Sequence, residues 1–199
     1  MVRPRTTSHA TLRPRRLGTA ALVVAAALLA SCDADRPTEP TASVRADVQH
    51  PGPTVVMFDE CDPATFNEAL GEGTCVRRDD GLTFDQFIAQ VTRLHRAISW
   101  RFTPNDFDAT FGQTIFAVNR GGEVHTFTHV AKFGGGIVPL LNMLVGTNDV
   151  APECTDLEAE DFVPPGGVYD EKADQRGRML FQCCIHPWMR EVVRVGGGT

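Results

Sequence analysis

The sequence predicts an all-β domain, an antiparallel sandwich or barrel, that follows an N-terminal helical extension. Two observations favour this fold class. From Ser99 onward, short segments of alternating apolar and polar residues are separated by Gly, Pro and Asp turns, which is typical of antiparallel sheets. The 199 residues are 42% hydrophobic and 22% charged, which is the composition of a soluble globular protein of one domain with appendages.

Residues 1–31 are predicted to be a signal peptide. Five arginines precede an uninterrupted run of small and apolar residues at 17–30, and no acidic residue occurs before Asp33. The run is too short to indicate a membrane-spanning helix. It ends in Leu29-Ala30-Ser31-Cys32, which resembles the bacterial lipobox, in which the cysteine is acylated and becomes the mature N-terminus. An ordinary signal peptide with an incidental cysteine is the alternative.

Residues 32–54 are expected to be the lipidated Cys32 and a flexible tether. Positions 33–53 hold four prolines and no large apolar side chain apart from two valines, so they cannot form a core. Removal of residues 1–31 leaves 14 basic and 25 acidic side chains, a formal net charge of −11. This charge makes nucleic acids and anionic lipid head groups poor partners for the folded part. The chain is therefore expected to be an exported lipoprotein, periplasmic or at the cell surface, that is held to the membrane by its lipid anchor.

Residues 55–98 are predicted to form a disulfide-bonded loop followed by a helix, and no function is assigned to them. Cys61 and Cys75 stand in a loop rich in Asp, Pro and Gly, and an exported chain makes a disulfide the default for such a pair. The bridge would contribute about 3 kcal/mol to stability in the chain-entropy model. A metal site for these thiols has no matching ligands nearby.

The helix of this segment has complete start signals. Thr83 is placed as N-cap, Gln86 completes a capping box, and apolar residues then recur at helical spacing as far as Ile98. One face of the helix is therefore expected to pack on the domain. His95 lies close to that face and is interpreted as a boundary histidine rather than a metal ligand.

The segment from Ser99 onward contains the predicted strands. Alternation and turn residues place them, in order, at 100–102, 107–111, 114–118, 124–130, 178–183 and 191–195. Gly121 and Gly122 supply the turn between the third strand and the fourth. The apolar stretch 134–148 is expected to be a short helix or a covering loop, and the acidic run 153–161 a solvated loop. Residues 99–199 are accordingly taken as one β domain.

The residues with the clearest chemistry lie in the run Phe181-Gln182-Cys183-Cys184-Ile185-His186-Pro187-Trp188-Met189. A thiolate, an imidazole and a thioether within seven residues form a soft ligand set that suits copper. In a strand, alternation would place Cys183 on the same face as Phe181, so that it emerges where the strand ends and a ligand loop begins. A second imidazole, that of His125, comes from a different strand.

This pattern resembles the cupredoxins, the family of type 1 blue copper proteins to which plastocyanin and amicyanin belong. That family takes one His from an upstream strand and Cys, His and Met from a single loop near the C-terminus, and the Cys-x-x-His-x-x-Met spacing is similar to the short amicyanin type. The resemblance covers roughly residues 99–195, with Trp100-Arg101-Phe102-Thr103-Pro104 and the run 121–127 as supporting marks. It implies a Greek-key, cupredoxin-like sandwich with one copper ion per chain.

The resemblance also implies a role for individual residues. Three equatorial ligands and one weak axial ligand would hold the copper, namely His125, Cys183, His186 and the axial Met189. The backbone N–H of Thr126 would donate to the cysteine sulfur, and Asn119 would help to fix the ligand loop. The electron port would be an apolar surface through which the loop histidine reaches solvent, made by His186, Pro187 and Trp188. Residues 137–145 would either widen that surface or pack in the core.

Cys184 departs from the usual family loop. Strand alternation turns it away from Cys183, and once the resemblance assigns Cys183 to copper, Cys154 is the only unassigned partner left for it. A Cys154–Cys184 disulfide is therefore expected by elimination. His129 follows His125 by two full strand repeats, about 13 Å along the strand, and is interpreted as a partly exposed strand histidine rather than a ligand.

The expected function is one-electron transfer at the exported face of a bacterial membrane, without enzymatic activity and with redox proteins as partners. Multicopper oxidases place histidines on both sides of the copper cysteine, whereas Gln182 and Cys184 stand there in this chain. Two alternatives stay open. One is a copper-binding module for storage, delivery or sensing, which requires both Cys183 and Cys184 at the metal. The other is a metal-free cell-surface sandwich that mediates contacts.

Overall fold

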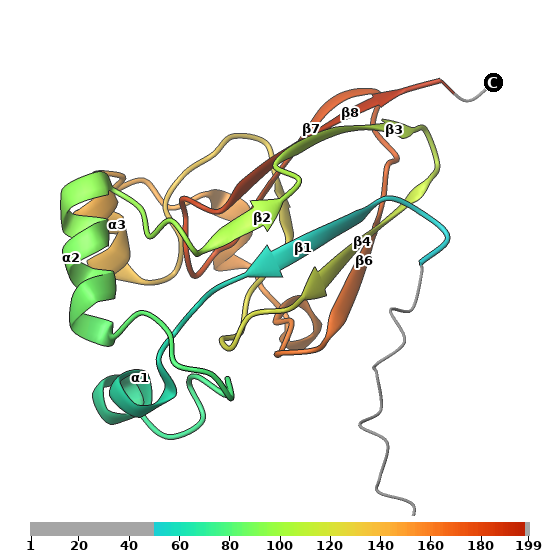
Figure 1. The fold of residues 1–199 in the computed structure, drawn as a ribbon. Helices are drawn as coiled ribbons and strands as arrows, with labels where there is room; N and C mark the ends of the chain where they lie inside the picture. Colours follow the sequence, from blue (N-terminus) through green and yellow to red (C-terminus); the bar gives the residue numbers. More distant parts are fainter. Residues whose placement is uncertain (1–49, 198–199) are drawn as a thin grey trace, which may run out of the picture. The chain divides into compact units, whose positions relative to one another are not determined.

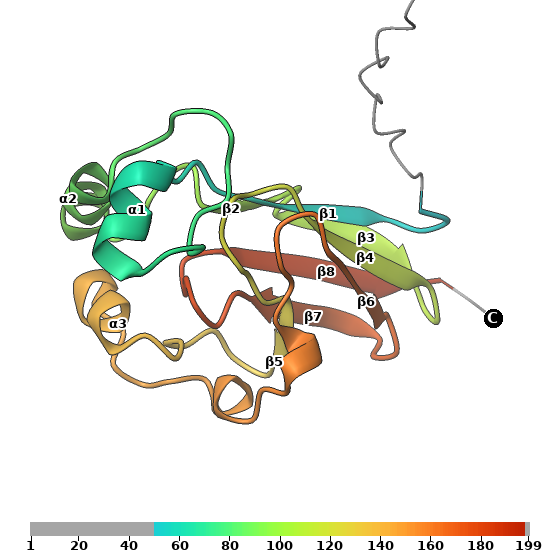
Figure 2. The ribbon, with the colours of Figure 1, turned by 90° about the horizontal axis from the view of Figure 1, so that it is seen from below.

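A computed structural model of the chain describes residues 50–197. The predicted signal peptide, the lipidated Cys32 and nearly all of the predicted tether lie outside the described residues. Residues 50–197 form two four-stranded sheets, and three α-helices gather at one end of them (Figure 1; Figure 2). The predicted β-sandwich is thereby confirmed. None of the helices within this range is both long enough and apolar enough to cross a membrane.

The first sheet brings the N-terminal segment into the sandwich. Its strands, in spatial order, are β2 (Arg101–Thr103), β1 (Thr54–Phe58), β4 (Thr114–Asn119) and β6 (Val168–Lys172). Alternate residues of β1 enter the core, and its Val55 and Met57 are fully buried. Because β1 lies between β2 and β4, this part of residues 55–98 belongs to the sandwich itself. The strand was not predicted, since five residues next to a turn-rich loop give too short a pattern.

The second sheet carries the C-terminal strands. In spatial order they are β3 (Asp106–Thr110), β8 (Arg190–Gly196), β7 (Gly177–Gln182) and β5 (Thr128–Val130). β7 runs antiparallel to both β8 and β5, whereas β3 is parallel to β8, as β1 is to β4. The sheets are therefore mixed rather than purely antiparallel. Each parallel pair joins strands that are far apart in the sequence, and a long connection between the strands is what parallel pairing requires.

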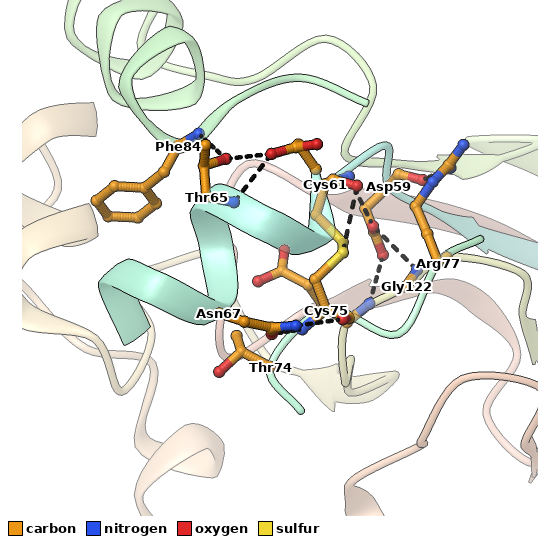
Figure 3. The surroundings of a disulfide bond; sticks show 12 residues. Asp59, Cys61, Thr65, Asn67, Thr74, Cys75, Arg77, Phe84 and Gly122 are labelled. Carbon is orange, nitrogen blue, oxygen red and sulfur yellow. Dashed lines mark hydrogen bonds between the residues drawn. A yellow bond between two sulfur atoms is a disulfide. The ribbon is translucent and has the colours of Figure 1, made fainter. Parts of the chain in front are cut away.

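A helix that was not predicted, α1 (Pro63–Leu70), lies beside the first disulfide (Figure 3). Asp62 caps it by accepting a hydrogen bond of 2.9 Å from the N–H of Thr65. The predicted Cys61–Cys75 bridge is present. Asn67 of α1 bonds both the N–H and the C=O of Cys75, at 2.9 and 3.0 Å. The disulfide and this side chain together fix α1 to the loop that follows it.

Two further helices complete the helical end. α2 (Phe84–Leu94) has the predicted capping box of Thr83 and Gln86, and it ends at His95 in the left-handed conformation, before the predicted limit at Ile98. α3 (Pro139–Val145) resolves the open choice for 134–148 in favour of a helix. The acidic run 153–161, expected to be a solvated loop, lies largely in two short 3₁₀ helices, Pro152–Thr155 and Ala159–Asp161.

Aromatic rings fill the space between the helices and the sheets. The rings of Phe66 in α1 and Phe87 in α2 lie 5.8 and 4.7 Å from that of Trp100. Between the sheets, Phe127 stacks on Phe181 with ring centroids 4.3 Å apart. All five side chains are buried. Close packing of this kind restrains the backbone around it, and the ligand-forming residues converge at this end of the sandwich.

Candidate metal centre

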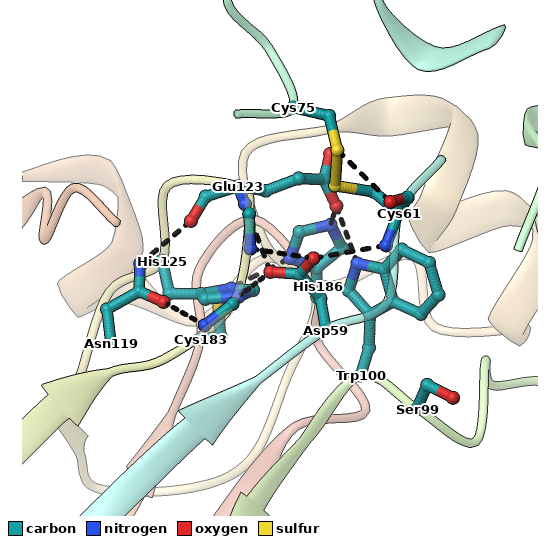
Figure 4. A network of polar contacts seen from close by, with 12 residues as sticks. Asp59, Cys61, Cys75, Ser99, Trp100, Asn119, Glu123, His125, Cys183 and His186 are labelled. Atoms are coloured by element: carbon teal, nitrogen blue, oxygen red, sulfur yellow. Dashed lines mark hydrogen bonds and ion pairs between the residues drawn. A yellow bond between two sulfur atoms is a disulfide. The ribbon is translucent and has the colours of Figure 1, made fainter. Parts of the chain in front are cut away.

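Three of the four predicted ligands come together in the interior. The side chains of His125, Cys183 and His186 place one ligand atom each within 4.8 Å of the others, and all three are buried. The Sγ of Cys183 lies 3.8 Å from the Nδ1 of His125 and 3.8 Å from the Nδ1 of His186. Both imidazoles therefore present the same nitrogen to the sulfur, from different segments of the chain. Figure 4 shows the surroundings of the two histidines, including Asp59 and Glu123.

The loop that carries Cys183 closes on itself by two backbone hydrogen bonds. Cys183 follows directly after β7, and its N–H donates to the C=O of Met189 at 3.0 Å. The N–H of Met189 in turn donates to the C=O of His186 at 2.9 Å. Met189 is buried in the same hydrophobic core as Cys183, so the loop directs both sulfur atoms inward. Its role as an axial ligand stays a prediction.

His125 is held by a pair of backbone bonds to a distant segment. Its N–H donates to the C=O of Val163 at 3.1 Å, and the N–H of Val163 returns a bond of 2.8 Å. Only Thr128–Val130 of the predicted strand 124–130 is a regular strand, because His125 pairs with this loop instead of with a sheet. Asn119 reinforces the arrangement, since its Nδ2 donates to the C=O groups of Glu123 and Val163 at 2.7 and 2.8 Å.

Thr126 links the two ligand segments. Its backbone N–H lies 3.5 Å from the Sγ of Cys183, in the position that the sequence predicted for a donor to the sulfur. Its hydroxyl accepts a hydrogen bond of 2.8 Å from the N–H of Cys184. An N–H directed at a thiolate withdraws charge from the sulfur and so influences the electronic properties of any metal that it binds.

A carboxylate that the sequence analysis did not identify holds the outer nitrogen of His125. The Nε2 of His125 and the Oδ2 of Asp59 are 2.9 Å apart, and both side chains are fully buried. Asp59 also accepts backbone N–H groups from Cys61, Gly122 and Glu123, at 3.2, 3.0 and 3.0 Å. A Cβ on Gly121 would overlap with the same carboxylate, so the Gly-Gly turn permits its close approach.

These contacts change the ionisation of the buried groups. Burial alone would raise the pKa of Asp59, but His125 and the backbone N–H groups of Glu123 and Gly122 outweigh burial and lower that pKa to about 2. Burial alone would lower the pKa of His125, but Asp59 and Cys183 raise it to about 9. The two imidazoles likewise overcome burial and lower the pKa of the Cys183 thiol. The centre therefore favours a thiolate beside imidazoles.

A second carboxylate faces the other histidine. The Oε2 of Glu123 lies 3.6 Å from the Nε2 of His186 and accepts a hydrogen bond of 2.6 Å from the Nε1 of Trp100. Burial raises the pKa of Glu123, although His186 opposes the rise. Each candidate histidine ligand thus has its Nδ1 toward the sulfur and its Nε2 toward a carboxylate. Carboxylates in this position orient metal-binding imidazoles and make them better donors.

The position of His186 differs from the predicted electron port. The side chain was expected to reach the surface, but His186 is only 3% exposed. The rings of Phe87, Trp100 and Trp188 lie 6.4, 6.4 and 5.5 Å from the imidazole. Pro187 is buried as well, and Trp188 is half-buried. The prediction that His186 reaches the surface was wrong, because α2 and the unpredicted α1 cover this end of the sandwich.

An apolar pocket of about 380 Å³ lies between the helices and His186. Its walls come mainly from the three helices, and its polar side chains include the buried Glu123 and His186. The predicted docking region 137–145 contributes to both surface and core. Ile137, Leu140 and Met143 are exposed, whereas Leu141 is buried.

Among residues 50–197, the remaining cysteines and histidines lie outside the cluster. The Cys154–Cys184 disulfide expected by elimination is present, and Cys183 is the free cysteine among the described residues. Two disulfides fit an oxidising compartment. His129 packs against Phe181 with ring centroids 5.2 Å apart, and the Nδ1 of His95 lies 2.9 Å from the C=O of Leu144. Neither histidine belongs to the cluster, as the sequence predicted.

No family model and no curated protein matches the sequence. Among solved structures, a purple cupredoxin from Nitrosopumilus maritimus is 12% identical, covers 72% of this chain and 99% of its own, and gives a TM-score of 0.39. Amicyanin from Paracoccus versutus is 20% identical over 48% of this chain and 73% of its own, with a TM-score of 0.33. Plastocyanin from Dryopteris crassirhizoma is 14% identical over 49% and 89%, also with a TM-score of 0.33.

Proposed function

We propose that the chain is a type 1 copper protein that carries one electron at a time and performs no catalysis of its own. The observation that carries this proposal is the equal separation of 3.8 Å between the Cys183 sulfur and the Nδ1 atoms of His125 and His186. A thiolate with two imidazoles and a nearby thioether is the donor set that selects copper over harder metals. His125, Cys183 and His186 would bind the ion, and Met189 would be the weak axial ligand.

Bound copper would supply a one-electron couple at this position. The residues of the chain would keep the ligand atoms in place during the change of charge. Asp59 holds His125 at 2.9 Å, Glu123 faces His186 at 3.6 Å, and the N–H of Thr126 points to the sulfur at 3.5 Å. Because all four candidate ligands are buried and the three equatorial ones each have such a second contact, little rearrangement would accompany electron transfer.

The state of Cys184 favours electron transfer over copper storage or delivery. A storage site would need both adjacent thiolates at the metal, but Cys184 is bonded to Cys154. The residue before Cys183 is Gln182, whose buried side chain accepts a hydrogen bond from the N–H of Gly134. Neither residue next to Cys183 is a histidine, so the chain lacks the flanking histidines that connect the copper cysteine to a second copper site in multicopper oxidases.

The proposal includes export and membrane attachment. Two disulfides agree with an oxidising compartment, and the Leu-Ala-Ser-Cys junction at Cys32 supports acylation at the exported face of a bacterial membrane. The flexible tether would let the copper domain reach redox proteins near that membrane.

The test is the visible spectrum of the purified domain after addition of one equivalent of Cu(II). We expect an intense blue or purple band from thiolate-to-copper charge transfer, and we expect Cys183→Ser to abolish it because a hydroxyl cannot replace the soft anionic ligand. Cys184→Ser is the matched control and should keep the band. A colourless protein, or loss of colour in both variants alike, would contradict the proposed function.

A further inference from the structure

Trp188 connects the buried centre to a second hollow, different from the apolar pocket. Its ring lies 5.5 Å from that of His186, at an interplanar angle of 63°, and the side chain is half-buried. Trp188 lines a surface groove of about 380 Å³ that runs past the C-terminal side of α2 and the start of β2. The Nε1 of this ring is buried without a hydrogen-bond partner among residues 50–197. Trp100 also lines the groove and lies 6.4 Å from His186, but it is buried, whereas Trp188 is nearer to His186 and is the more exposed of the two rings.

The groove is basic on a protein that is otherwise acidic. Residues 50–197 contain 21 acidic and 12 basic side chains, a formal net charge of −9. Three arginines line the groove, Arg96, Arg101 and Arg190, and no aspartate or glutamate does. None of the three forms an ion pair within the described residues, whereas Arg194 elsewhere pairs with Asp106. The positive charge of the groove is therefore available to a partner.

Two of these arginines are also held in place by the fold. Arg101 donates to the C=O of Ser99 at 3.3 Å and lies over the ring of Phe58 at 5.1 Å. Arg190 donates through Nε to the C=O of Pro187 at 2.8 Å and lies over Phe133 at 4.9 Å. Guanidinium groups that are already oriented lose less freedom when they bind carboxylates, so they suit recognition of an acidic surface.

We infer that this groove is the docking surface for a redox protein with an acidic surface around its own redox centre, and that Trp188 is the contact through which electrons reach the centre. The inference rests on the proposed function. One electron passes between the partner's redox centre and the copper, so one site is oxidised as the other is reduced, and no bond or proton changes place. An opposite charge at the contact accelerates the encounter of two proteins, and this effect falls with ionic strength.

The apolar pocket is a weaker candidate for this contact. It also borders His186, but its one acidic side chain, Glu123, is buried and already bonded to Trp100. Nothing in that pocket selects a class of partner. The groove is lined by three arginines and two tryptophans, Trp100 and Trp188, and arginine and tryptophan are residue types enriched where proteins bind each other most strongly.

The first test locates the anion-binding surface without using electron transfer. Hexacyanochromate(III), a redox-inert paramagnetic trianion, would be titrated into ¹⁵N-labelled metal-free protein, and line broadening would be followed by NMR. We expect broadening of the amides at 96–101 and 188–190, and a loss of affinity of about tenfold in Arg96→Gln/Arg101→Gln/Arg190→Gln. Arg178→Gln, at the far end of β7, is the matched control and should bind as wild type does.

The single variant Arg96→Gln keeps the test valid if the triple variant misfolds. Arg96 is exposed and makes no hydrogen bond or ion pair that the structure records, so its replacement should not affect folding. It should weaken binding of the trianion as well. Broadening that centres on another surface, or that the arginine substitutions leave unchanged, would overturn the docking site. This result is independent of copper, so it stays distinct from a failure of the proposed function, which the absence of a visible band would reveal.

The second test asks whether electrons reach the copper through Trp188. In the copper-loaded protein, the rate of oxidation by hexacyanoferrate(III) should fall with increasing salt and should decrease about tenfold in the triple arginine variant. Trp188→Leu should keep the trianion affinity but slow electron transfer, and Trp188→Phe should restore part of the rate because an aromatic ring is again present. Equal rates in wild type and Trp188→Leu would remove Trp188 from the route.

Discussion

Asp59 and His125 are 66 residues apart in the sequence, yet the Oδ2 of one lies 2.9 Å from the Nε2 of the other in the fully buried interior. The contact joins the end of β1 to the candidate metal centre. It exists because β1 pairs in parallel with β4, which brings the two segments to the same edge of the sheet. The N-terminal segment is therefore needed to assemble the environment of the proposed ligands, in addition to covering it.

Replacement of Asp59 tests that relationship. In Asp59→Asn, the NH₂ group would face two N–H donors whichever way the amide turned, either those of His125 and Glu123 or those of Cys61 and Gly122, so the hold on His125 would weaken. We expect copper affinity to fall about 10-fold to 100-fold, and the reduction potential to rise because the imidazole donates less charge. Competitive titration with a copper chelator and voltammetry would measure these effects. Asp85→Asn, at the exposed start of α2, is the control and should change neither value.

The same carboxylate should determine part of the acid sensitivity of the metal-free protein. Its pKa of about 2 in the folded state lies below the ordinary 3.8, so its contribution to stability is complete above about pH 4 and is lost as the pH falls toward 2. We expect the free energy of unfolding of wild type to exceed that of Asp59→Asn at pH 5, and this difference to shrink as the pH is lowered to 3. Urea titrations of both proteins at several pH values would show it. A difference that is constant with pH would mean that folding does not lower the pKa of this carboxylate.

Near neutral pH, His125 and Cys183 have opposite effects on how the free energy of unfolding changes with pH. The raised pKa of His125, about 9, contributes stability that is lost as the pH rises from about 6.5 toward that value. The lowered pKa of the Cys183 thiol contributes in the opposite direction, because the unfolded chain still binds that proton. The acid range is therefore where the effect of Asp59 is best isolated.

The second disulfide should affect stability and leave the spectrum unchanged. The Cys154–Cys184 bridge closes a separation of 30 residues, which corresponds to about 3–4 kcal/mol in the chain-entropy model. Cys154→Ser and Cys184→Ser should each lower the free energy of unfolding by about this amount, and the double variant should lose little more. Denaturation by urea and the visible band of the copper form provide the two measurements. Strictly additive losses would show that the cysteines act separately.

Local sequence patterns predicted the parts of the centre that depend on local structure. Cys183 and His186 come from one loop whose spacing is visible in the sequence, and the N–H of Thr126 was expected from the resemblance to the cupredoxins. Asp59 gave no such signal, because its contact depends on strand pairing across 66 residues. The burial of His186 was missed for a related reason. It depends on how α1 and α2 pack over the sandwich, and an amphipathic helix shows in its sequence that one face is buried but does not show against what.

Glu123 is a residue of the centre that the sequence does display. It stands two residues before His125, and a carboxylate that close to a candidate ligand often reaches a ring nitrogen of a metal-binding histidine. In the structure it faces His186 instead, with the Nε1 of Trp100 as its hydrogen-bond donor. The residue type was therefore visible in the sequence, whereas its partner was determined by the tertiary fold.

The lipid anchor concerns residues outside the described range and stays a prediction. The arginines, the apolar run and the Leu-Ala-Ser-Cys junction occur together, so the mature chain should begin at an acylated Cys32. Wild type should then partition into membranes, and Cys32→Ala should be released into the soluble fraction. Detergent phase separation followed by immunoblotting would distinguish the two. Release of both proteins alike would remove the anchor from the proposed function.

Met189 tests whether the centre is of the blue copper type. The thioether is buried at the end of a loop whose backbone is fixed by bonds from Cys183 to Met189 and from Met189 to His186. A weak axial ligand tunes the potential of such a centre more than it holds the metal, so Met189→Gln should retain copper. Its potential should be lower than that of wild type, because an amide oxygen stabilises Cu(II) better than a thioether does. Protein-film voltammetry would report the potential, and metal analysis the copper content.

Met143→Gln, on the exposed face of α3, is the matched control and should change neither quantity. Complete loss of copper from Met189→Gln would instead identify Met189 as a principal ligand and would exclude a centre of this type.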